Sequence, residues 1–171
     1  KIIDEMRDFS DWIEFVAVQR AGEPLLDKNI ASRIRKLKDI GIKRVSISTN
    51  ASRLDEKKTR ELLDAGLDEL MISIDAVDKE NYEKTRIGLK YDRVMANIRN
   101  FFKIREEICP DMLVRVRGVS FYNLSVEDDR EALNRWEDFW GEFKKDQDRI
   151  YMKRAHTWGN QISIDGYEKE S

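Results

Sequence analysis

The chain has 171 residues, a length that suits one domain able to bury its own core. Charged residues make up 39%, but 32 Lys and Arg nearly balance 34 Asp and Glu, which argues against a nucleic-acid or membrane surface. No apolar stretch approaches membrane length, and one cysteine, Cys109, cannot form an intramolecular disulfide, so the cytoplasm is the expected compartment.

Five apolar runs predict strands, and stretches of helical periodicity lie between them. The predicted strands are residues 13–19, 44–49, 69–75, 112–119 and 150–155. The opening residues 1–6 are interpreted as the end of a helix, and the helices predicted between the strands are residues 28–40 with Asp27 as N-cap, 54–65, 91–108 and 126–144. Gly41 and Gly66 follow the first two of these helices and are typical stop signals.

The expected fold class is α/β with parallel strands, because crossover helices join each strand to the next. Such strands form either a doubly wound sheet or part of a barrel. Val114 and Val116 fall on one face of the fourth strand, and Arg115 and Arg117 fall on the other. Since a barrel can carry polar groups on its inner face, this alternation favours a partial TIM-like barrel whose polar faces point inward.

Polar residues gather at the carboxyl ends of the predicted strands, where α/β proteins place their ligands. They are Arg20 and Glu23, then Ser48, Thr49 and Asn50, then Ser73 and Asp75, then Arg115 and Arg117, and last His156. Each alone has a structural explanation, such as a cap on the following helix. Five successive polar strand ends favour a shared polar ligand instead, because buried polar groups need partners.

Three of these segments resemble motifs of the radical S-adenosylmethionine (radical SAM) enzymes, in the same order. Residues 21–26 (AGEPLL) are similar to the Gly-Gly-Glu-Pro motif, 48–51 (STNA) to the Thr-Asn-Gly strand end, and 73–76 (SIDA) to the Ser-Leu/Ile-Asp-Gly/Ala strand end. The similarity continues through residues 82–86 and Asn97, and covers about residues 13–160. Residues 156–160 are similar to the link that precedes the auxiliary-cluster domain in the SPASM subgroup.

The resemblance implies a partial (β/α)6 barrel over residues 1–160, with 161–171 beginning a C-terminal linker, and S-adenosylmethionine as cofactor. Glu23, with the backbone of Gly22, would bind the methionyl ammonium. The other implied cofactor-binding residues are Arg20 beside the first motif, Ser48, Thr49 and Asn50 at the methionyl portion, and Ser73 and Asp75 at the ribose. Arg86, Arg115 and Arg117 are the candidates for the methionine carboxylate or an anionic substrate group, and the sequence does not choose among them.

The family's reaction also depends on a 4Fe-4S cluster held by a Cys-x3-Cys-x2-Cys loop, which Cys109 alone cannot replace. We therefore expect no metal ligand in this chain, and we expect the cluster cysteines and the first strand to lie upstream of Lys1. The chain would be the cofactor-binding middle of a longer enzyme, inactive by itself. That enzyme would cleave S-adenosylmethionine to a 5'-deoxyadenosyl radical, which takes hydrogen from an unknown small-molecule or peptide substrate, with a flavodoxin or ferredoxin as electron donor.

Two other functions stay open on the residues alone. A cluster-free barrel aldolase or isomerase would need an inward lysine or a general base, for which Lys153 and His156 are the candidates. A non-catalytic barrel that binds a small ligand or another protein would need neither of them.

Overall fold

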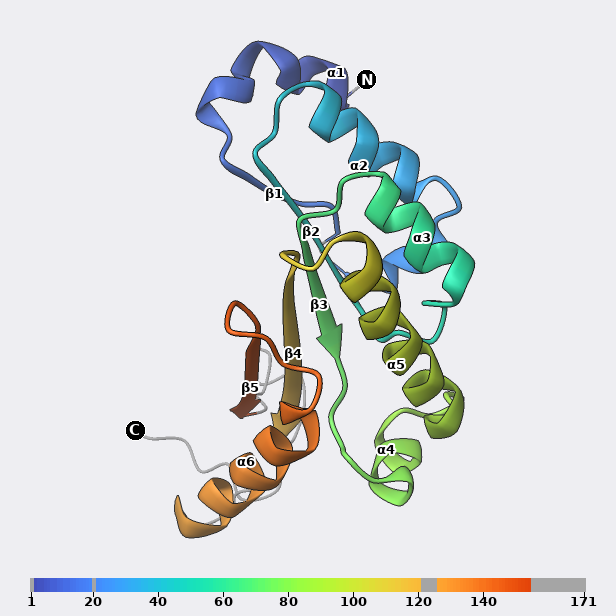
Figure 1. Ribbon diagram of the computed structural model, residues 1–171, viewed down its shortest axis with the longest axis vertical. Coiled ribbons are helices and arrows are strands. Elements are labelled where there is room, and N and C mark those ends of the chain that lie inside the picture. Colours follow the sequence, from blue (N-terminus) through green and yellow to red (C-terminus); the bar gives the residue numbers. More distant parts are fainter. Residues whose placement is uncertain (1, 20, 121–125, 155–171) are drawn as a thin grey trace, which may run out of the picture.

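The computed structural model describes residues 2–19, 21–120 and 126–154, and its strands form one parallel sheet (Figure 1). The strands are β1 (Phe15–Ala17), β2 (Arg44–Thr49), β3 (Glu69–Ser73), β4 (Leu113–Ser120) and β5 (Arg149–Arg154), in the order β1-β2-β3-β4-β5. Each strand pairs with its neighbour in sequence. Since crossover connections between parallel strands are right-handed, this order places the connecting helices on one side of the sheet. Figure 1 shows α2, α3 and α5 along one side of β1–β3. A doubly wound sheet would instead reverse its order at a switch point. The predicted α/β fold of a partial barrel is confirmed.

The helices match the predicted plan, with differences at their ends. They are α1 (Ile2–Glu5), η1 (Met6–Trp12), η2 (Pro24–Leu26), α2 (Ile30–Asp39), α3 (Glu56–Asp64), α4 (Lys79–Thr85), α5 (Tyr91–Ile108) and α6 (Val126–Gly141), where η marks a 3-10 helix. The predictions for β2 and α5 are confirmed at both ends. The first predicted strand is shortened to Phe15–Ala17, and at its start Ile13 instead caps the end of η1 with a backbone hydrogen bond to Ser10.

The predicted N-cap of α2 is wrong. The turn of η2 uses Pro24–Leu26, so α2 begins only at Ile30 and Asn29 occupies the N-cap position. Asp27 instead accepts a hydrogen bond from the Asn29 backbone N–H at 2.8 Å and pairs with Arg33 at 2.7 Å. These two contacts lower the pKa of the Asp27 carboxyl, so this residue joins η2 to α2 as a carboxylate.

The core lies between the sheet and the helices. One face of the sheet carries Val45 and Ile47 of β2, Leu70 and Ile72 of β3, and Val114 and Val116 of β4, all at most 2% exposed. These residues cluster with the buried faces of α2, α3 and α5. By alternation, the opposite face, here called the inner face, carries Ser48, Met71, Ser73, Arg115 and Arg117.

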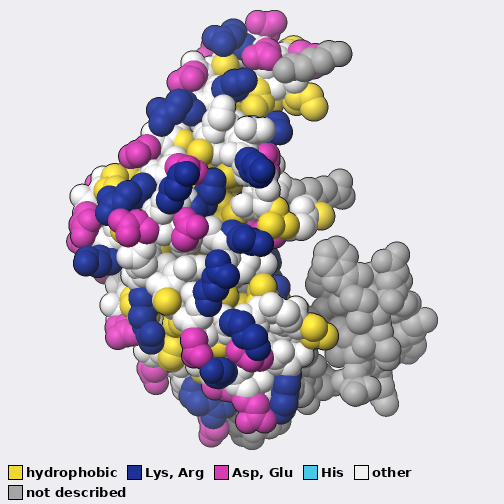
Figure 2. All heavy atoms as spheres, turned by 90° about the vertical axis from the view of Figure 1, so that its right-hand side faces the viewer, with side chains coloured by type: hydrophobic (Ala, Val, Ile, Leu, Met, Phe, Trp, Pro, Cys, Tyr) yellow, Lys and Arg dark blue, Asp and Glu magenta, His cyan; other side chains and the backbone are white. Residues whose placement is uncertain are grey.

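The outer surface of the helices is strongly and evenly charged. Figure 2 shows Lys and Arg side chains mixed with Asp and Glu over the side of the molecule where α2, α3 and α5 lie. Several of these charges pair within one helix, as Arg60 does with Glu56 at 3.0 Å. None of the helices in the described part of the chain is both long and apolar enough to span a membrane.

Gly118 of β4 is where the sheet meets α6 most closely. A Cβ atom at this position would lie 3.1 Å from Cζ2 of Trp136, which is 2% exposed, and 3.3 Å from the backbone oxygen of Ile74. Gly118→Ala is therefore expected to lower the free energy of unfolding by about 1–3 kcal/mol in urea denaturation. Gly141→Ala is the control, because nothing lies within 4 Å of its Cβ position, and it is expected to cause no loss. Equal stability of the two variants would contradict this packing.

Candidate functional site

A cavity of about 440 Å³ opens at the carboxyl ends of β1–β4. Its volume lies within the range of small-molecule sites. It is lined by Gln19, Ala21, Gly22, Glu23, Ser48, Thr49, Asn50, Ser73, Arg86 and Arg117. The strand ends selected from the sequence therefore meet at one place, and the sequence reasoning missed only Gln19 and Ala21 among the lining residues.

Glu23 is held between the end of β1 and the end of β2. Gly22 precedes it with φ +80°, a conformation that favours glycine, and Pro24 begins η2 directly after it. Oε1 of Glu23 accepts from Thr49 Oγ1 at 2.7 Å and from the Leu25 backbone N–H at 3.0 Å. Oε2 accepts from the Asn50 backbone N–H at 2.8 Å. A carboxylate has about four acceptor positions, so the carboxylate caps η2, and the described residues leave one position on Oε2 for a cation.

The turn after β2 is fixed on both sides. Thr49, only 1% exposed, accepts from the Ala51 backbone N–H at 3.0 Å while its hydroxyl donates to Glu23. Ala51 has φ +59°, in the left-handed region where the resembling motif carries glycine. Asn97 of α5 donates from Nδ2 to the Ala51 backbone oxygen at 2.9 Å. This support holds a strained residue directly behind the cavity.

Arg86 reaches the cavity from the end of α4. Its Nε donates to Asp75 Oδ2 at 2.6 Å, and its Nη2 donates to Ser73 Oγ at 3.2 Å. The Asp75 side chain is 4% exposed, and its Oδ1 accepts from the Val119 backbone N–H at 3.1 Å. Asp75 does not line the cavity, so the structure places it behind Arg86 rather than at the ligand surface.

Tyr82 lies on the same helix, and its phenol is fully buried. Burial is the main cause that raises its pKa, with Arg86 lowering it and Asp75 raising it slightly. The phenol therefore stays neutral. It packs at a ring-centroid distance of 5.6 Å from Tyr91, so it supports the end of α4 as an uncharged side chain.

Two polar atoms of the cavity wall have no partner. Nε of Arg117 and Oε1 of Gln19 are buried without a hydrogen bond from any described residue. No described carboxylate pairs with Arg117 either, although it ends a row of inner-face residues with Ser73. Because a buried polar atom without a partner is costly, these two atoms fit a ligand that brings an anion and a donor group.

Arg115 lies outside the cavity. It precedes Arg117 by two residues, so it is about 6.6 Å nearer the amino end of β4. Its Nε lies 2.9 Å from Oε1 of Glu69, whose side chain is 4% exposed. The Nε–H has no hydrogen-bond partner among the described residues, but Nη2 of Arg115 donates to Oε2 of Glu69 at 3.5 Å, so the ion pair includes a hydrogen bond. Lys153 is exposed on β5 and does not line the cavity, while Arg20 and His156 lie outside the described residues.

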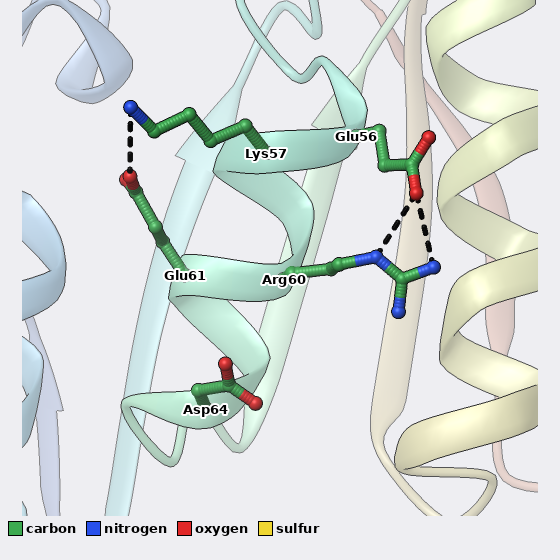
Figure 3. A pocket seen from close by; sticks show the side chains of 5 residues that line it. All are labelled: Glu56, Lys57, Arg60, Glu61 and Asp64. Carbon is green, nitrogen blue, oxygen red and sulfur yellow. Dashed lines mark hydrogen bonds and ion pairs between the residues drawn. The ribbon is translucent and has the colours of Figure 1, made fainter.

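The residues present do not fit a 4Fe-4S cluster. Within residues 2–19, 21–120 and 126–154, no three His, Cys, Asp or Glu side chains are grouped as metal ligands. Burial, and to a smaller extent Asp64, raises the pKa of the Cys109 thiol, so it stays protonated rather than becoming the thiolate that binds iron. A more open hollow over α3 (Figure 3) is lined by charges of that one helix, four of which form two pairs, Lys57 with Glu61 at 4.0 Å and Arg60 with Glu56 at 3.0 Å.

The model of the Radical SAM superfamily matches residues 1–132 of the chain. The chain belongs to the radical SAM superfamily. Membership implies an enzyme whose cofactors are S-adenosylmethionine and a 4Fe-4S cluster, and it makes the cavity at the strand ends the candidate S-adenosylmethionine site.

Relatives of this radical SAM chain are longer proteins. An uncharacterised protein of Methanocaldococcus jannaschii is 38% identical over 87 residues, which is 50% of this chain and 30% of that protein. A probable GTP 3',8-cyclase of Methanococcus maripaludis is 36% identical over 83 residues, 48% of this chain and 28% of that protein. This chain thus spans less than a third of these relatives.

The fold is also found in solved structures. SuiB of Streptococcus suis, bound to the precursor peptide SuiA, aligns with a TM-score of 0.66 at 17% identity, over 98% of this chain and 34% of SuiB. SuiB bound to S-adenosylmethionine aligns with a TM-score of 0.64 at 18% identity, over 97% of this chain and 33% of SuiB. At this level of identity the similarity shows the shared fold.

Proposed function

We propose that this chain forms the S-adenosylmethionine-binding part of a radical SAM enzyme, and that the cavity at the strand ends holds the methionyl group. One observation carries the proposal. Glu23 and Arg117 line the same cavity. Among the described residues, Glu23 has an acceptor position that no donor fills, and Arg117 has no anion beside it. A ligand with an ammonium and a carboxylate matches this pair of charges.

The chain's residues bind and orient this ligand. Glu23 accepts from the ammonium, while Arg117 and Arg86 face the carboxylate. Ser48 and Asn50 contact the methionyl chain, and Ser73 lies toward the ribose. Asp75 acts through Arg86, because its carboxylate is taken up by that guanidinium and by the Val119 backbone N–H.

In the whole enzyme, the cluster and S-adenosylmethionine would together supply radical chemistry, in which one electron from the donor protein would be used to cleave the sulfonium and hydrogen would be taken from the substrate. The proposal places the cluster cysteines in another part of that enzyme, since one cysteine in this chain cannot hold the cluster. It also includes a small-molecule or peptide substrate, a flavodoxin or ferredoxin as electron donor, a SPASM-type extension after residue 160 and a cytoplasmic location.

Glu23→Gln is expected to weaken S-adenosylmethionine binding by the chain about tenfold or more in calorimetric titration. Glutamine keeps one oxygen for Thr49 and Leu25, but it loses the charge that holds the ammonium, and charge-assisted hydrogen bonds are worth about 1.5–3 kcal/mol.

Glu56→Gln is the matched control, because it removes the same charge from the exposed surface of α3 (Figure 3). It is expected to leave the affinity unchanged. Equal affinity of Glu23→Gln and the wild type would contradict the role of Glu23.

A further inference from the structure

The inner face continues from the cavity onto β5. Arg117 is in register with Tyr151, and Val119 is in register with Lys153, so Tyr151 and Lys153 share the inner face with Arg117. Nζ of Lys153 lies 5.9 Å from the centroid of the Tyr151 ring. The lysine side chain therefore turns back toward the row of Arg117, a residue that lines the cavity.

The cations around this face fall into three groups, and one of these is Arg149, which is in register with Arg115 and donates to backbone oxygens of the loop before β5. Arg86 and Arg115 are neutralised by Asp75 and Glu69, whose side chains are each 4% exposed. Arg117 and Lys153 form no ion pair with any residue that the structure describes. Within the described part of the chain, the carboxyl half of the inner face near β4 and β5 thus has two cations without an anionic partner.

S-adenosylmethionine accounts for only part of this charge. Its ammonium matches Glu23 and its carboxylate matches Arg117, but its third charge is a sulfonium cation, which needs no lysine. Among the described residues, Lys153 then has no anionic partner. A molecule bound beside the cofactor would supply one if it carried an anion.

We infer that the substrate of this enzyme carries an oxyanion, a carboxylate or a phosphate, which Lys153 binds on the inner face of β5 beside the cofactor cavity. This inference rests on the proposed function. The ammonium is a point charge with three donors and reaches an anion from several directions, while Tyr151 limits where the lysine side chain can lie.

For the test, the chain is first saturated with S-adenosylhomocysteine, so that the amino-acid carboxylate of this ligand occupies Arg117. The complex is then titrated with pyrophosphate in one series and with glutarate in the other. Amide chemical shifts of Val119 and Lys153 report binding at this place. Lys153→Gln is expected to raise the dissociation constant of the preferred anion about fivefold, and Lys153→Arg is expected to preserve it. The difference between the two series identifies the oxyanion.

Lys57→Gln, which removes the same charge from α3, is expected to leave the anion affinity unchanged. The inference is overturned if neither anion binds the wild type, if Lys153→Gln binds both as well as the wild type does, or if Lys57→Gln weakens binding equally. Lys153→Gln is expected to retain its affinity for S-adenosylhomocysteine. Failure of the wild type to bind S-adenosylhomocysteine would instead overturn the proposed function. In that case, titration with the two anions in the absence of S-adenosylhomocysteine would still test the role of Lys153.

Discussion

Arg105→Met is expected to lower the free energy of unfolding by about 3–5 kcal/mol, because it leaves the Asp148 carboxylate buried without its cation. Arg105 of α5 is 1% exposed, and its Nη1 donates to both carboxylate oxygens of Asp148 at 2.8 Å. Asp148 also accepts from the backbone N–H groups of Val114 and Lys145, at 2.9 and 3.0 Å. One buried ion pair therefore joins α5, the start of β4 and the loop before β5.

Urea denaturation measures the change, and Arg60→Gln on α3 is the control. Its ion pair with Glu56 is exposed on both sides, so the expected loss is below about 1 kcal/mol. The double change Arg105→Met with Asp148→Leu is expected to recover only part of the loss, because the Val114 and Lys145 N–H groups stay without an acceptor. A loss below about 1 kcal/mol for Arg105→Met would show that water reaches this pair.

Arg117→Met is expected to weaken S-adenosylhomocysteine binding about tenfold to a hundredfold without lowering the stability of the chain. The guanidinium has a buried nitrogen with no described partner, so its removal takes away a desolvated charge and no ion pair. The ligand loses the group that faces its carboxylate. Residues that bind a ligand but lower the stability of the free protein are typical of functional sites.

Arg115→Met is the matched control and should give the opposite result. Arg115 lies two residues from Arg117 on the same face, but it pairs with the buried Glu69 and does not line the cavity. Its removal is expected to lower stability, because Glu69 loses its cation, and to leave the affinity unchanged. Calorimetric titration and urea denaturation of both variants check the pair of outcomes. Loss of affinity in Arg115→Met alone would contradict the structural assignment of the two arginines.

The fold was predictable where the apolar pattern is strong. The six residues of β2 and the eighteen of α5 carry continuous or periodic apolar positions, and both are correct at each end. Helix α4 was not predicted, because Tyr82 is its only buried residue and a single apolar position has no period. Asp27 has the residue type of an N-cap, but the turn that Pro24 starts moves the helix beginning beyond its reach.

The location of the site was predictable for a topological reason, since parallel strands bring their carboxyl ends to one edge of the sheet. The separate roles of the polar residues were not. Arg115 and Arg117 have the same face and similar neighbours in sequence, and only the register with β3 shows that Glu69 neutralises one of them. Likewise, only the hydrogen bond from Arg86, which is eleven residues away, shows that the Asp75 carboxylate already has a partner within the chain.

The central claim is that the cavity recognises the charged amino-acid end of S-adenosylmethionine. The most direct measurement compares the affinities of the chain for S-adenosylhomocysteine and for 5'-methylthioadenosine, which has the same adenosyl thioether but lacks the ammonium and the carboxylate. Binding of S-adenosylhomocysteine is expected to be about a hundredfold tighter, and the combined change Glu23→Gln with Arg117→Met should remove most of that difference. Equal affinity of the wild type for the two ligands would contradict the claim.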